Sequence, residues 1–346
     1  MLVLGAEDVE SILATIDYED LVQLMRTVFE TLSGSPSRRD PAEGQGEDVA
    51  SPLRTTIHSQ KQTTLFMPSR LAVSGGSGIK VVSIPRQGAS PNGLPATTLL
   101  LDDDTGRVNA IVNATQLTAL RNAAGSALAT RLAGISSPNR IVLFGAGLQV
   151  LHHAKMFLRL YPTLESCTIV NRSFNARLNN LSDRLRFEFP SKTILCGLLS
   201  DAPFVQNALS RADIVCTATP SASPLFETSW LNRTAHINLI GSYTPEMREV
   251  HDDLIAAASL ILVDSIRACS VEAGELIHVP EDRLVEVGHF SCSKTSQGRS
   301  AGNSVAIPRE SYTVFKSVGV GVQDVAIAAF IVEHGKEYGF GNVVSY

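Results

Sequence analysis

Three cationic side chains stand in runs that are otherwise apolar or uncharged: Arg54, Lys80 and Arg121. Lys80 is the clearest case, because the run Ile79 to Val82 around it is apolar on both sides. A lysine in such a run is either a charge on an edge strand or a buried amine, and burial lowers its pKa toward values that suit proton transfer near neutral pH. If the three cations converge, they bind a carboxylate beside a reacting imino or keto carbon. Their spacing in the sequence leaves that convergence open.

A glycine turn between two apolar runs forms the second candidate site. Gly145 and Gly147 follow the apolar run Ile141 to Phe144, and a helical pattern and another apolar run, Cys167 to Val170, come after them. A strand, a glycine turn, a helix and a second strand make the βαβ unit that binds a dinucleotide, with the pyrophosphate at the helix N-terminus. Val150 occupies the place of the third glycine in that motif, so the interpretation depends on the context of the turn.

The end of the second strand indicates which dinucleotide binds. Sites for NAD place an Asp or Glu there to accept hydrogen bonds from the ribose 2′-hydroxyl, whereas this chain has Asn171 followed by Arg172. A guanidinium pairs with a 2′-phosphate, so the sequence favours NADPH, with NADH as the alternative if Arg172 is only a solvated charge. The cofactor candidates of this stretch are Gly145, Ala146, Gly147, Leu148, Gln149, Asn171, Arg172 and Ser173.

Two kinds of strand pattern would position these residues. Strand-like runs over residues 54–112 are separated by Gly, Pro, Asn and Ser turns and predict a mixed or antiparallel sheet, followed by a helix over 115–133. From residue 139 onward, strands alternate with helices, which predicts a parallel sheet. The expected fold class is α/β, with a Rossmann-type doubly wound parallel sheet plus an α+β domain. Residues 33–51 and 278–310 are predicted to be polar, irregular loops.

The carboxyl ends of the later strands supply further candidates, because ligands of doubly wound sheets bind beyond those ends. The rule selects Thr217 and Thr219 as cofactor residues, and the pair Gly241–Ser242, of which Ser242 is a candidate for binding the substrate. The stretch Thr313–Gly321 alternates Val with Gly. It is either core packing or a backbone loop that lies against the nicotinamide ring.

Composition argues against several other classes of protein. A net charge of −5 without a basic run disfavours a protein that binds nucleic acid. The five cysteines are scattered, without a C-x-x-C pair or a Cys/His cluster, which favours reduced thiols in the cytoplasm and no metal site. The run Asp102–Asp104 is expected to be a solvated hairpin turn. Acidic residues near the N-terminus and the lack of an apolar stretch of about 18 residues disfavour a signal peptide and a membrane span.

The order of several motifs resembles that of the ornithine cyclodeaminase/μ-crystallin family. The resemblance covers nearly the whole chain outside 33–51 and 280–308, in the motifs LRTTIH, GIKVVS, GLPATTLLLDDDTG, TALRNAAGSALA, GAGLQ, NRS, HINLIGS and FKSVGVGVQD. It implies a discontinuous substrate-binding and dimerisation domain, residues 1–125 and 313–346. A Rossmann domain that binds NADP, residues 126–312, would be inserted into it. The resemblance also implies a homodimer formed through the N-terminal sheet.

The same resemblance implies roles for single residues. Arg54, Lys80 and Arg121 would face the carboxylate and the reacting carbon of a small imino- or amino-acid substrate, with Lys80 and Arg121 as the catalytic residues. Besides the glycine turn and the NRS motif, the residues that would line the cofactor are Thr97, Thr217, Thr219, Ile240, Val318 and Gly319.

One position separates the reactions of this family. Ornithine cyclodeaminases resemble one another in an Asp two residues after the glycine that matches Gly241, where this chain has Tyr243. The departure disfavours ornithine cyclisation. It favours NADPH-dependent reduction of a cyclic 2-imino acid, Δ1-pyrroline-2-carboxylate or Δ1-piperideine-2-carboxylate, to proline or pipecolate. The alternatives are an ornithine cyclodeaminase that uses another acid, an amino-acid dehydrogenase of alanine type, and a non-catalytic protein that binds a thyroid-hormone-like small molecule.

Overall fold

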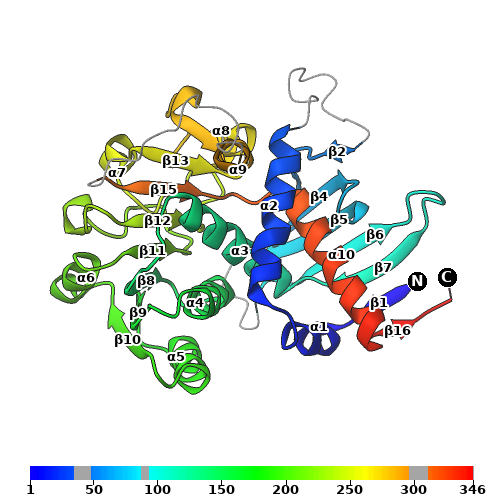
Figure 1. Ribbon diagram of the computed structural model, residues 1–346, viewed down its shortest axis with the longest axis horizontal. Helices are drawn as coiled ribbons and strands as arrows, with labels where there is room; N and C mark the ends of the chain where they lie inside the picture. The colour runs from blue at the N-terminus through cyan, green and yellow to red at the C-terminus, as the bar shows by residue number, and fades with distance from the viewer. Residues whose placement is uncertain (35–47, 87–92, 296–310, 346) are drawn as a thin grey trace. The chain divides into compact units, whose positions relative to one another are not determined.

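The chain divides into two compact units. The computed structural model describes residues 1–34, 48–86, 93–295 and 311–345. By its internal contacts the first unit comprises Met1–Arg121 and Gly319–Tyr346, and the second comprises Asn122–Val318 (Figure 1). The first unit is therefore assembled from both ends of the chain, and the second is continuous in sequence.

The first unit contains a mixed, mainly antiparallel sheet in the order β16-β1-β7-β6-β5-β4-β2, with β3 paired to β4. Its strands are β1 (Leu2–Leu4), β2 (Val49–Ala50), β3 (Thr55–His58), β4 (Gln62–Leu71), β5 (Gly76–Pro85), β6 (Ala96–Leu101), β7 (Val108–Asn113) and β16 (Asn342–Val343). Only β1 and β7 pair in parallel among these described strands. The predicted mixed or antiparallel sheet is confirmed, and Asp102 begins the turn between β6 and β7 as expected.

Helices α1 (Ala6–Leu13) and α10 (Gly321–Tyr338) pack against this sheet, and α2 (Tyr18–Gly34) packs against α10. Figure 1 shows α10 beside α2, although the two helices come from opposite ends of the chain. Met67, Lys80 and Thr98 stand opposite one another on β4, β5 and β6, and all three are buried. Because residues in register point to the same side of a sheet, Lys80 lies on the buried side, against which α10 packs.

The other side of the same sheet is apolar and only half-buried. It carries Phe66, Ile79, Val81, Leu99 and Ile111, which are in register or diagonal to one another on neighbouring strands. These residues alternate along each strand with the buried ones, as the period of two in a β-strand requires. The sheet therefore presents a second, continuous apolar surface.

The second unit is a parallel sheet in the order β10-β9-β8-β11-β12-β15-β13-β14. Its strands are β8 (Arg140–Phe144), β9 (Ser166–Asn171), β10 (Thr193–Leu198), β11 (Ile214–Thr217), β12 (His236–Leu239), β13 (Leu260–Val263), β14 (Leu284–Glu286) and β15 (Thr313–Lys316). Its helices are α4 (Leu148–Leu160), α5 (Ala176–Glu188), α6 (Ala202–Leu209), α7 (Asp252–Ala257), α8 (Ile266–Glu272) and α9 (Val287–Thr295), and α3 (Leu117–Leu132) crosses the division between the units. The strand order reverses direction between β8 and β11, which is the switch point of a doubly wound sheet. The predicted fold class is confirmed.

Two segments predicted as loops lie partly outside the described residues. Of residues 33–51, residues 35–47 lie outside the described part of the chain, and β2 follows them. Of residues 278–310, residues 296–310 lie outside the described part of the chain. The described remainder contains β14 and α9, so the prediction of an irregular loop there was wrong. Strand β14 pairs with β13 and buries Glu286, so tertiary contacts order a segment whose polar composition gives no strand signal.

Strand β15 lies between β12 and β13 in the second sheet. Residues 313–318 therefore belong to the second unit by their contacts, whereas the family resemblance implied a domain boundary at residue 313. The functional division into a substrate-binding and a cofactor-binding domain stays a prediction.

Candidate functional site

Lys80 is buried in the middle of the first unit, with 2% of its surface exposed. Strand β5 lies between β4 and β6, so Lys80 is not on an edge strand, and of the two readings of this lysine the buried amine is correct. Burial lowers its pKa from the ordinary 10.5 to about 8, with Asp324 opposing the shift and Arg121 and Arg54 adding to it. The amine can therefore both hold and release a proton near neutral pH.

Asp324 joins Lys80 to Arg121. Its Oδ2 lies 2.7 Å from Nζ of Lys80, and its Oδ1 accepts a hydrogen bond of 3.0 Å from Nε of Arg121. Burial alone would raise the pKa of Asp324, but Arg121 and Lys80 outweigh burial and hold that pKa below its ordinary value. Next to it, Oε1 of Gln323 accepts from Nη1 of Arg121 at 3.0 Å. The sequence reasoning did not identify either of these two partners.

Gly319 brings Arg54 into the same cluster. Its carbonyl accepts a hydrogen bond of 3.1 Å from Nη2 of Arg54. Its φ is +82°, which favours glycine, and a Cβ added there would lie 2.6 Å from Nη2 of Arg121. Arg54, Lys80 and Arg121 thus converge within the first unit, whereas Thr97 lies on the opposite side of the sheet from Lys80.

The glycine turn of the second unit has the geometry of an anion cradle. Gly145 has a φ of +113°, and a Cβ added there would lie 2.9 Å from the carbonyl oxygen of Ala218. Gly147 begins α4 without a side-chain cap, and a Cβ added to it would meet nothing within 4 Å. The first N–H groups of a helix lack intrahelical partners and attract phosphate. The turn therefore fits a dinucleotide pyrophosphate, and the buried Oε1 of Gln149 lacks a partner among the described residues.

His153 fixes the first turn of α4. Its Nδ1–H donates to the carbonyl of Gln149 at 2.7 Å, and its Nε2 accepts from the hydroxyl of Ser126 on α3 at 2.9 Å. Burial lowers the pKa of His153 to about 4, so the ring stays neutral and keeps both bonds at physiological pH. The cradle is thus anchored to the neighbouring helix.

The end of β9 carries the residues predicted to choose the cofactor. Asn171 donates from Nδ2 to the carbonyl of Ser173 at 2.8 Å, which shapes the turn after the strand. Arg172 is exposed between them. Its guanidinium is accessible at the carboxyl edge of the parallel sheet, where the fold places ligands.

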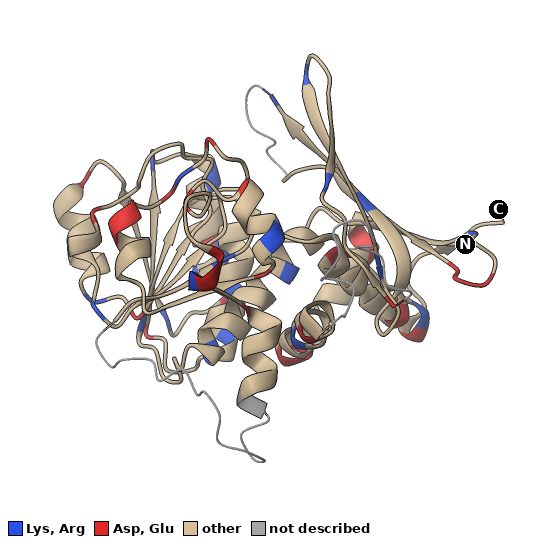
Figure 2. Ribbon diagram, turned by 90° about the horizontal axis from the view of Figure 1, so that it is seen from above, with Lys and Arg blue, Asp and Glu red and all other residues tan. Residues whose placement is uncertain are grey.

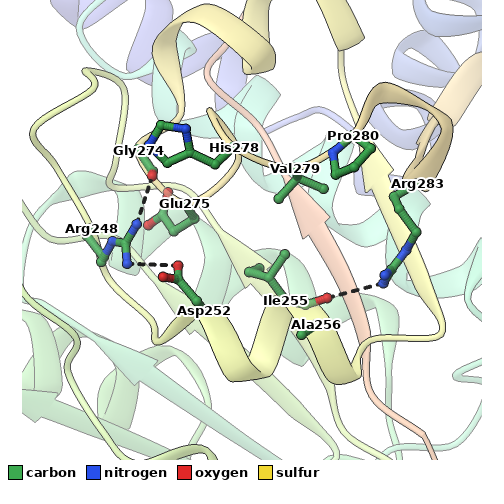
Figure 3. A pocket seen from close by; sticks show the side chains of 10 residues that line it. All are labelled: Arg248, Asp252, Ile255, Ala256, Gly274, Glu275, His278, Val279, Pro280 and Arg283. Atoms are coloured by element: carbon green, nitrogen blue, oxygen red, sulfur yellow. Dashed lines mark hydrogen bonds and ion pairs between the residues drawn. The ribbon is translucent and has the colours of Figure 1, made fainter.

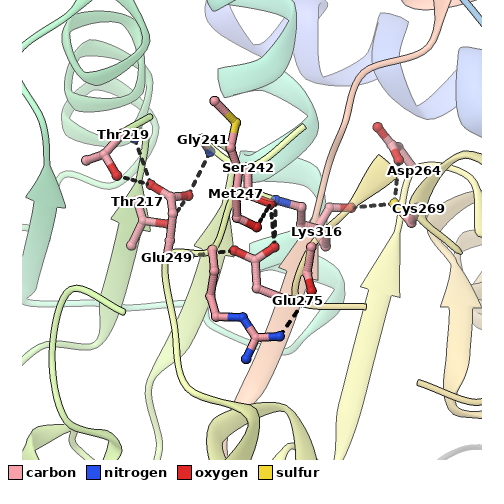
Figure 4. Close-up of polar contacts among 12 residues, drawn as sticks. Thr217, Thr219, Gly241, Ser242, Met247, Glu249, Asp264, Cys269, Glu275 and Lys316 are labelled. Atoms are coloured by element: carbon pink, nitrogen blue, oxygen red, sulfur yellow. Dashed lines mark hydrogen bonds and ion pairs between the residues drawn. The ribbon is translucent and has the colours of Figure 1, made fainter. Parts of the chain in front are cut away.

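Glu249 ties together the ends of β11 and β12 (Figure 4). Its carboxylate accepts hydrogen bonds of 2.7 to 2.8 Å from the Thr217 hydroxyl, the Thr219 hydroxyl and N–H, and the Gly241 N–H. Burial raises the pKa of Glu249, with Lys316 and the donors of Thr217 and Thr219 opposing the shift. The hydroxyls of Thr217 and Thr219, predicted to contact the cofactor, are therefore engaged by a carboxylate that the sequence reasoning missed.

Ser242 is fully buried, and its hydroxyl donates to Oε2 of Glu275 at 2.6 Å (Figure 4). The same carboxylate lies 3.4 Å from Nζ of Lys316 and accepts from the backbone N–H of Glu249. Burial would raise the pKa of Glu275, but Lys316 and these hydrogen bonds hold it below its ordinary value. The hydroxyl is therefore engaged within the second unit, and the substrate contact expected of Ser242 stays a prediction. Of the other predicted residues in this unit, Ala146, Ile240 and Val318 are buried and Leu148 is half-buried.

A pocket of about 280 Å³ lies beside Glu275 on the second unit (Figure 3). Two guanidinium groups line it, but Arg248 pairs with Asp252 at 2.8 Å and Arg283 donates to the carbonyl of Ile255 at 3.3 Å. The residues that line this pocket include none of the predicted site residues, although Glu275 accepts from Ser242. All of them belong to the second unit, so the pocket contains no member of the cation cluster.

Other kinds of site lack support in the part of the chain that the structure describes. There, His, Cys, Asp and Glu residues form no group that could hold a metal ion. Basic and acidic residues are interspersed on both units (Figure 2). None of the described helices combines the length and the apolarity that crossing a membrane requires.

Comparison with known proteins establishes the relationship of the whole chain. A sequence model of the ornithine cyclodeaminase/mu-crystallin family matches residues 20–338. The chain belongs to this family. The family predicted from the order of the motifs is therefore confirmed.

Relatives within the family carry different names. An uncharacterized cyclodeaminase of Dictyostelium discoideum is 30% identical over 80% of this chain and 80% of its own length. A Delta(1)-pyrroline-2-carboxylate reductase of Bacillus cereus is 26% identical over 88% of this chain and 92% of its own. The ketimine reductase mu-crystallin of Rattus norvegicus is 28% identical over 84% and 87%.

Solved structures share the fold over the full length of the chain. The Delta(1)-pyrroline-2-carboxylate reductase of Thermococcus litoralis, solved with NADH and L-proline, matches with a TM-score of 0.81 at 23% identity. The match covers 99% of this chain and 100% of that one. At 23% identity, this structural similarity establishes the fold alone.

Proposed function

We propose that this protein is an oxidoreductase that reduces a cyclic 2-imino acid, Δ1-pyrroline-2-carboxylate or Δ1-piperideine-2-carboxylate, to L-proline or L-pipecolate with a reduced nicotinamide cofactor. The observation that carries the proposal is the buried Lys80, whose pKa is about 8 and which lies beside Arg121 and Arg54. The names of the Bacillus cereus and rat relatives support the reaction class.

The cation cluster suits the acid group of the substrate. Arg54 and Arg121 would bind its carboxylate, because guanidinium groups pair with carboxylates in a planar, directed geometry. The cluster holds three cations against the single carboxylate of Asp324, so an added anion is favoured electrostatically. Gly319 would hold both arginines in place for this contact.

Lys80 would supply the proton. Reduction of a C=N bond adds a hydride to the carbon and a proton to the nitrogen, so the two electrons come with the hydride and the product is an amine. When bound, the nicotinamide cofactor supplies the hydride. A protonated lysine with a pKa near the working pH is an effective general acid for the nitrogen.

The glycine turn would hold the cofactor. Gly145, Gly147 and the uncapped N-terminus of α4 suit the pyrophosphate, and Arg172 suits a 2′-phosphate. We therefore propose NADPH as the preferred cofactor. NADH is the alternative, because the structure of the Thermococcus litoralis relative contains it.

We also propose a homodimer. The half-buried side of the first sheet, with Phe66, Ile79, Val81, Leu99 and Ile111, is an apolar surface that a second copy would cover. The direct substrate contacts in this proposal are Arg54, Lys80 and Arg121. Ser242 is left out, because its hydroxyl donates to Glu275.

The assay that tests the reaction follows the absorbance of the reduced cofactor with each of the two cyclic imines. Turnover of either imine is the expected result. Oxidation of alanine in its place would indicate the amino-acid dehydrogenase, and conversion of ornithine to proline with release of ammonia would show that Tyr243 does not exclude cyclisation. Tight binding of a small molecule without turnover of any substrate would support the non-catalytic binding protein.

A further inference from the structure

We propose that Asp324 is a positioning residue that holds the Lys80 ammonium and the Arg121 guanidinium in a fixed relation, so that Lys80 keeps the proton it delivers. The catalytic part of this inference rests on the proposed function. The part that concerns the state of Lys80 stands on contacts within the first unit alone.

The geometry requires both oxygens of one carboxylate. Oδ2 of Asp324 lies 2.7 Å from Nζ of Lys80, and Oδ1 accepts from Nε of Arg121 at 3.0 Å. The two cations come from β5 and α3, so Asp324 connects two elements that the sheet and the helix bring in separately. Each contact is buried, with side-chain exposures of 2% to 3%, so water does not screen it.

The N-terminus of α10 holds this carboxylate in place. Asp324 is in the first turn of the helix, where the helix dipole favours a negative charge. The neighbouring Gln323 accepts from Arg121 and also from the backbone N–H of Val320 at 3.2 Å, which ties the guanidinium to the start of the same helix. A displacement of the Asp324 carboxylate would therefore disturb its contacts with both Lys80 and Arg121.

The charges around Lys80 explain why the amine needs this partner. Arg121 and Arg54 both disfavour its protonated form, as does burial, and Asp324 opposes them. The residues opposite Lys80 on the adjacent strands, Met67 and Thr98, are uncharged. Among the groups that face Lys80, Asp324 supplies the negative charge.

The decisive variant is Asp324→Asn, which keeps the shape of the side chain and removes its charge. The full-length protein, labelled with carbon-13 at the lysine ε-carbons, is titrated by NMR, and the Lys80 signal is assigned from its absence in Lys80→Arg. We expect the titration midpoint of Lys80 to fall by about one pH unit or more, a tenfold or larger loss of proton affinity. The matched control is Asp103→Asn, which removes an ion pair with Arg70 at the surface and should leave the midpoint unchanged.

A second variant separates charge from position. Asp324→Glu keeps the charge but moves the carboxylate by one methylene, so the Lys80 midpoint should stay within about half a unit while kcat falls roughly tenfold. A Lys80 midpoint that is the same in folded Asp324→Asn as in the wild type would overturn the inference. So would a wild-type kcat in Asp324→Glu, which also covers the case in which Asp324→Asn does not fold.

The two proposals fail in different ways. If the wild-type protein reduces neither imine but the Lys80 midpoint still falls in Asp324→Asn, the proposed function is wrong and the effect of Asp324 on Lys80 stands. If the wild-type protein reduces an imine and the midpoint does not move, the proposed function stands and the inference is wrong.

Discussion

The guanidinium of Arg121 occupies the space in which a side chain at Gly319 would stand. A Cβ added to Gly319 would lie 2.6 Å from Nη2 and 2.8 Å from Nη1 of that arginine, closer than real Cβ atoms approach other atoms. The carbonyl of the same glycine accepts from Arg54. One backbone position therefore sets the location of two arginines that the sequence separates widely.

Gly319→Ala should weaken substrate binding. The new methyl group displaces Arg121, and the φ of +82° adds backbone strain, so we expect KM for the imine to rise about tenfold or more with a smaller change in kcat. The control is Gly339→Ala, which has a φ of +73° and open space around the added Cβ. It carries similar strain without moving an arginine. Equal kinetic effects of the two substitutions would contradict the role given to Gly319.

The rate of imine reduction should fall as pH rises through about 8, the pKa of Lys80. The sign follows from the role: a general acid must be protonated, and above its pKa Lys80 has lost the proton it would deliver. Lys80→Met should lower kcat by about a hundredfold or more and abolish this limb of the pH profile. The control is Lys336→Met, at an exposed lysine, which should keep both the wild-type kcat and the fall in rate above pH 8. Full activity in Lys80→Met would show that Lys80 is not the proton donor.

Arg172→Ser should change the choice of cofactor. Loss of the exposed guanidinium removes the partner of the 2′-phosphate, so we expect KM for NADPH to rise roughly tenfold to a hundredfold while KM for NADH stays nearly constant. Steady-state kinetics with both cofactors measures the ratio of the KM for NADPH to the KM for NADH. Arg211→Ser, another exposed arginine of the second unit, should leave it unchanged. Equal losses with the two cofactors would show that Arg172 does not read the phosphate.

Glu249→Gln should destabilise the second unit and weaken cofactor binding. An amide offers one oxygen where the carboxylate accepts four hydrogen bonds, so at least one buried N–H or hydroxyl loses its partner. We expect a loss of about 1–3 kcal/mol in the free energy of unfolding, measured by urea denaturation, and a higher Kd for the cofactor. Glu227→Gln, with its side chain 61% exposed, is the control. An unchanged unfolding midpoint would contradict this account of the network.

Val81→Glu should convert the protein to a monomer. The charge would lie on the half-buried apolar side of the first sheet, where a partner copy would have to desolvate it. Analytical ultracentrifugation of wild type and variant measures the change in mass. Val73→Glu, at a residue 62% exposed in the turn before β5, should leave the mass unchanged. A wild-type monomer would show that this surface has another use.

The sequence predicted those parts of the molecule that local patterns encode. The βαβ unit around Gly145 followed from the alternation of strand and helix patterns, and the parallel sheet followed from their repetition. Lys80 stood out because a charge inside an apolar strand is unusual. These features depend on residues that are close together along the chain, which is where periodicity carries information.

The partners of the site residues could not be predicted in this way. Asp324 is 203 residues away from Arg121 in sequence, and an acid in the first turn of a helix is ordinary enough to be explained by the helix dipole alone. Glu249 lies in a polar stretch after Gly241 and gave no sign of burial. The one available signal was Asp324 itself, the only acid in the first turn of a helix that is apolar from Val325 to Val332.

The position of α10 after the second unit in sequence has a consequence for synthesis on the ribosome. Lys80 and Arg121 are made early, but the carboxylate that neutralises them arrives only with the last helix. Until then, burying the two cations side by side would cost free energy, because neither has its counterion. The second unit is continuous in sequence and can fold while it emerges, whereas the first must wait for its last segment. A nascent chain that stops before residue 321 is therefore expected to expose β4 and β5 to chaperones, and the cluster of Lys80, Arg121 and Asp324 would be completed only after α10 has been made.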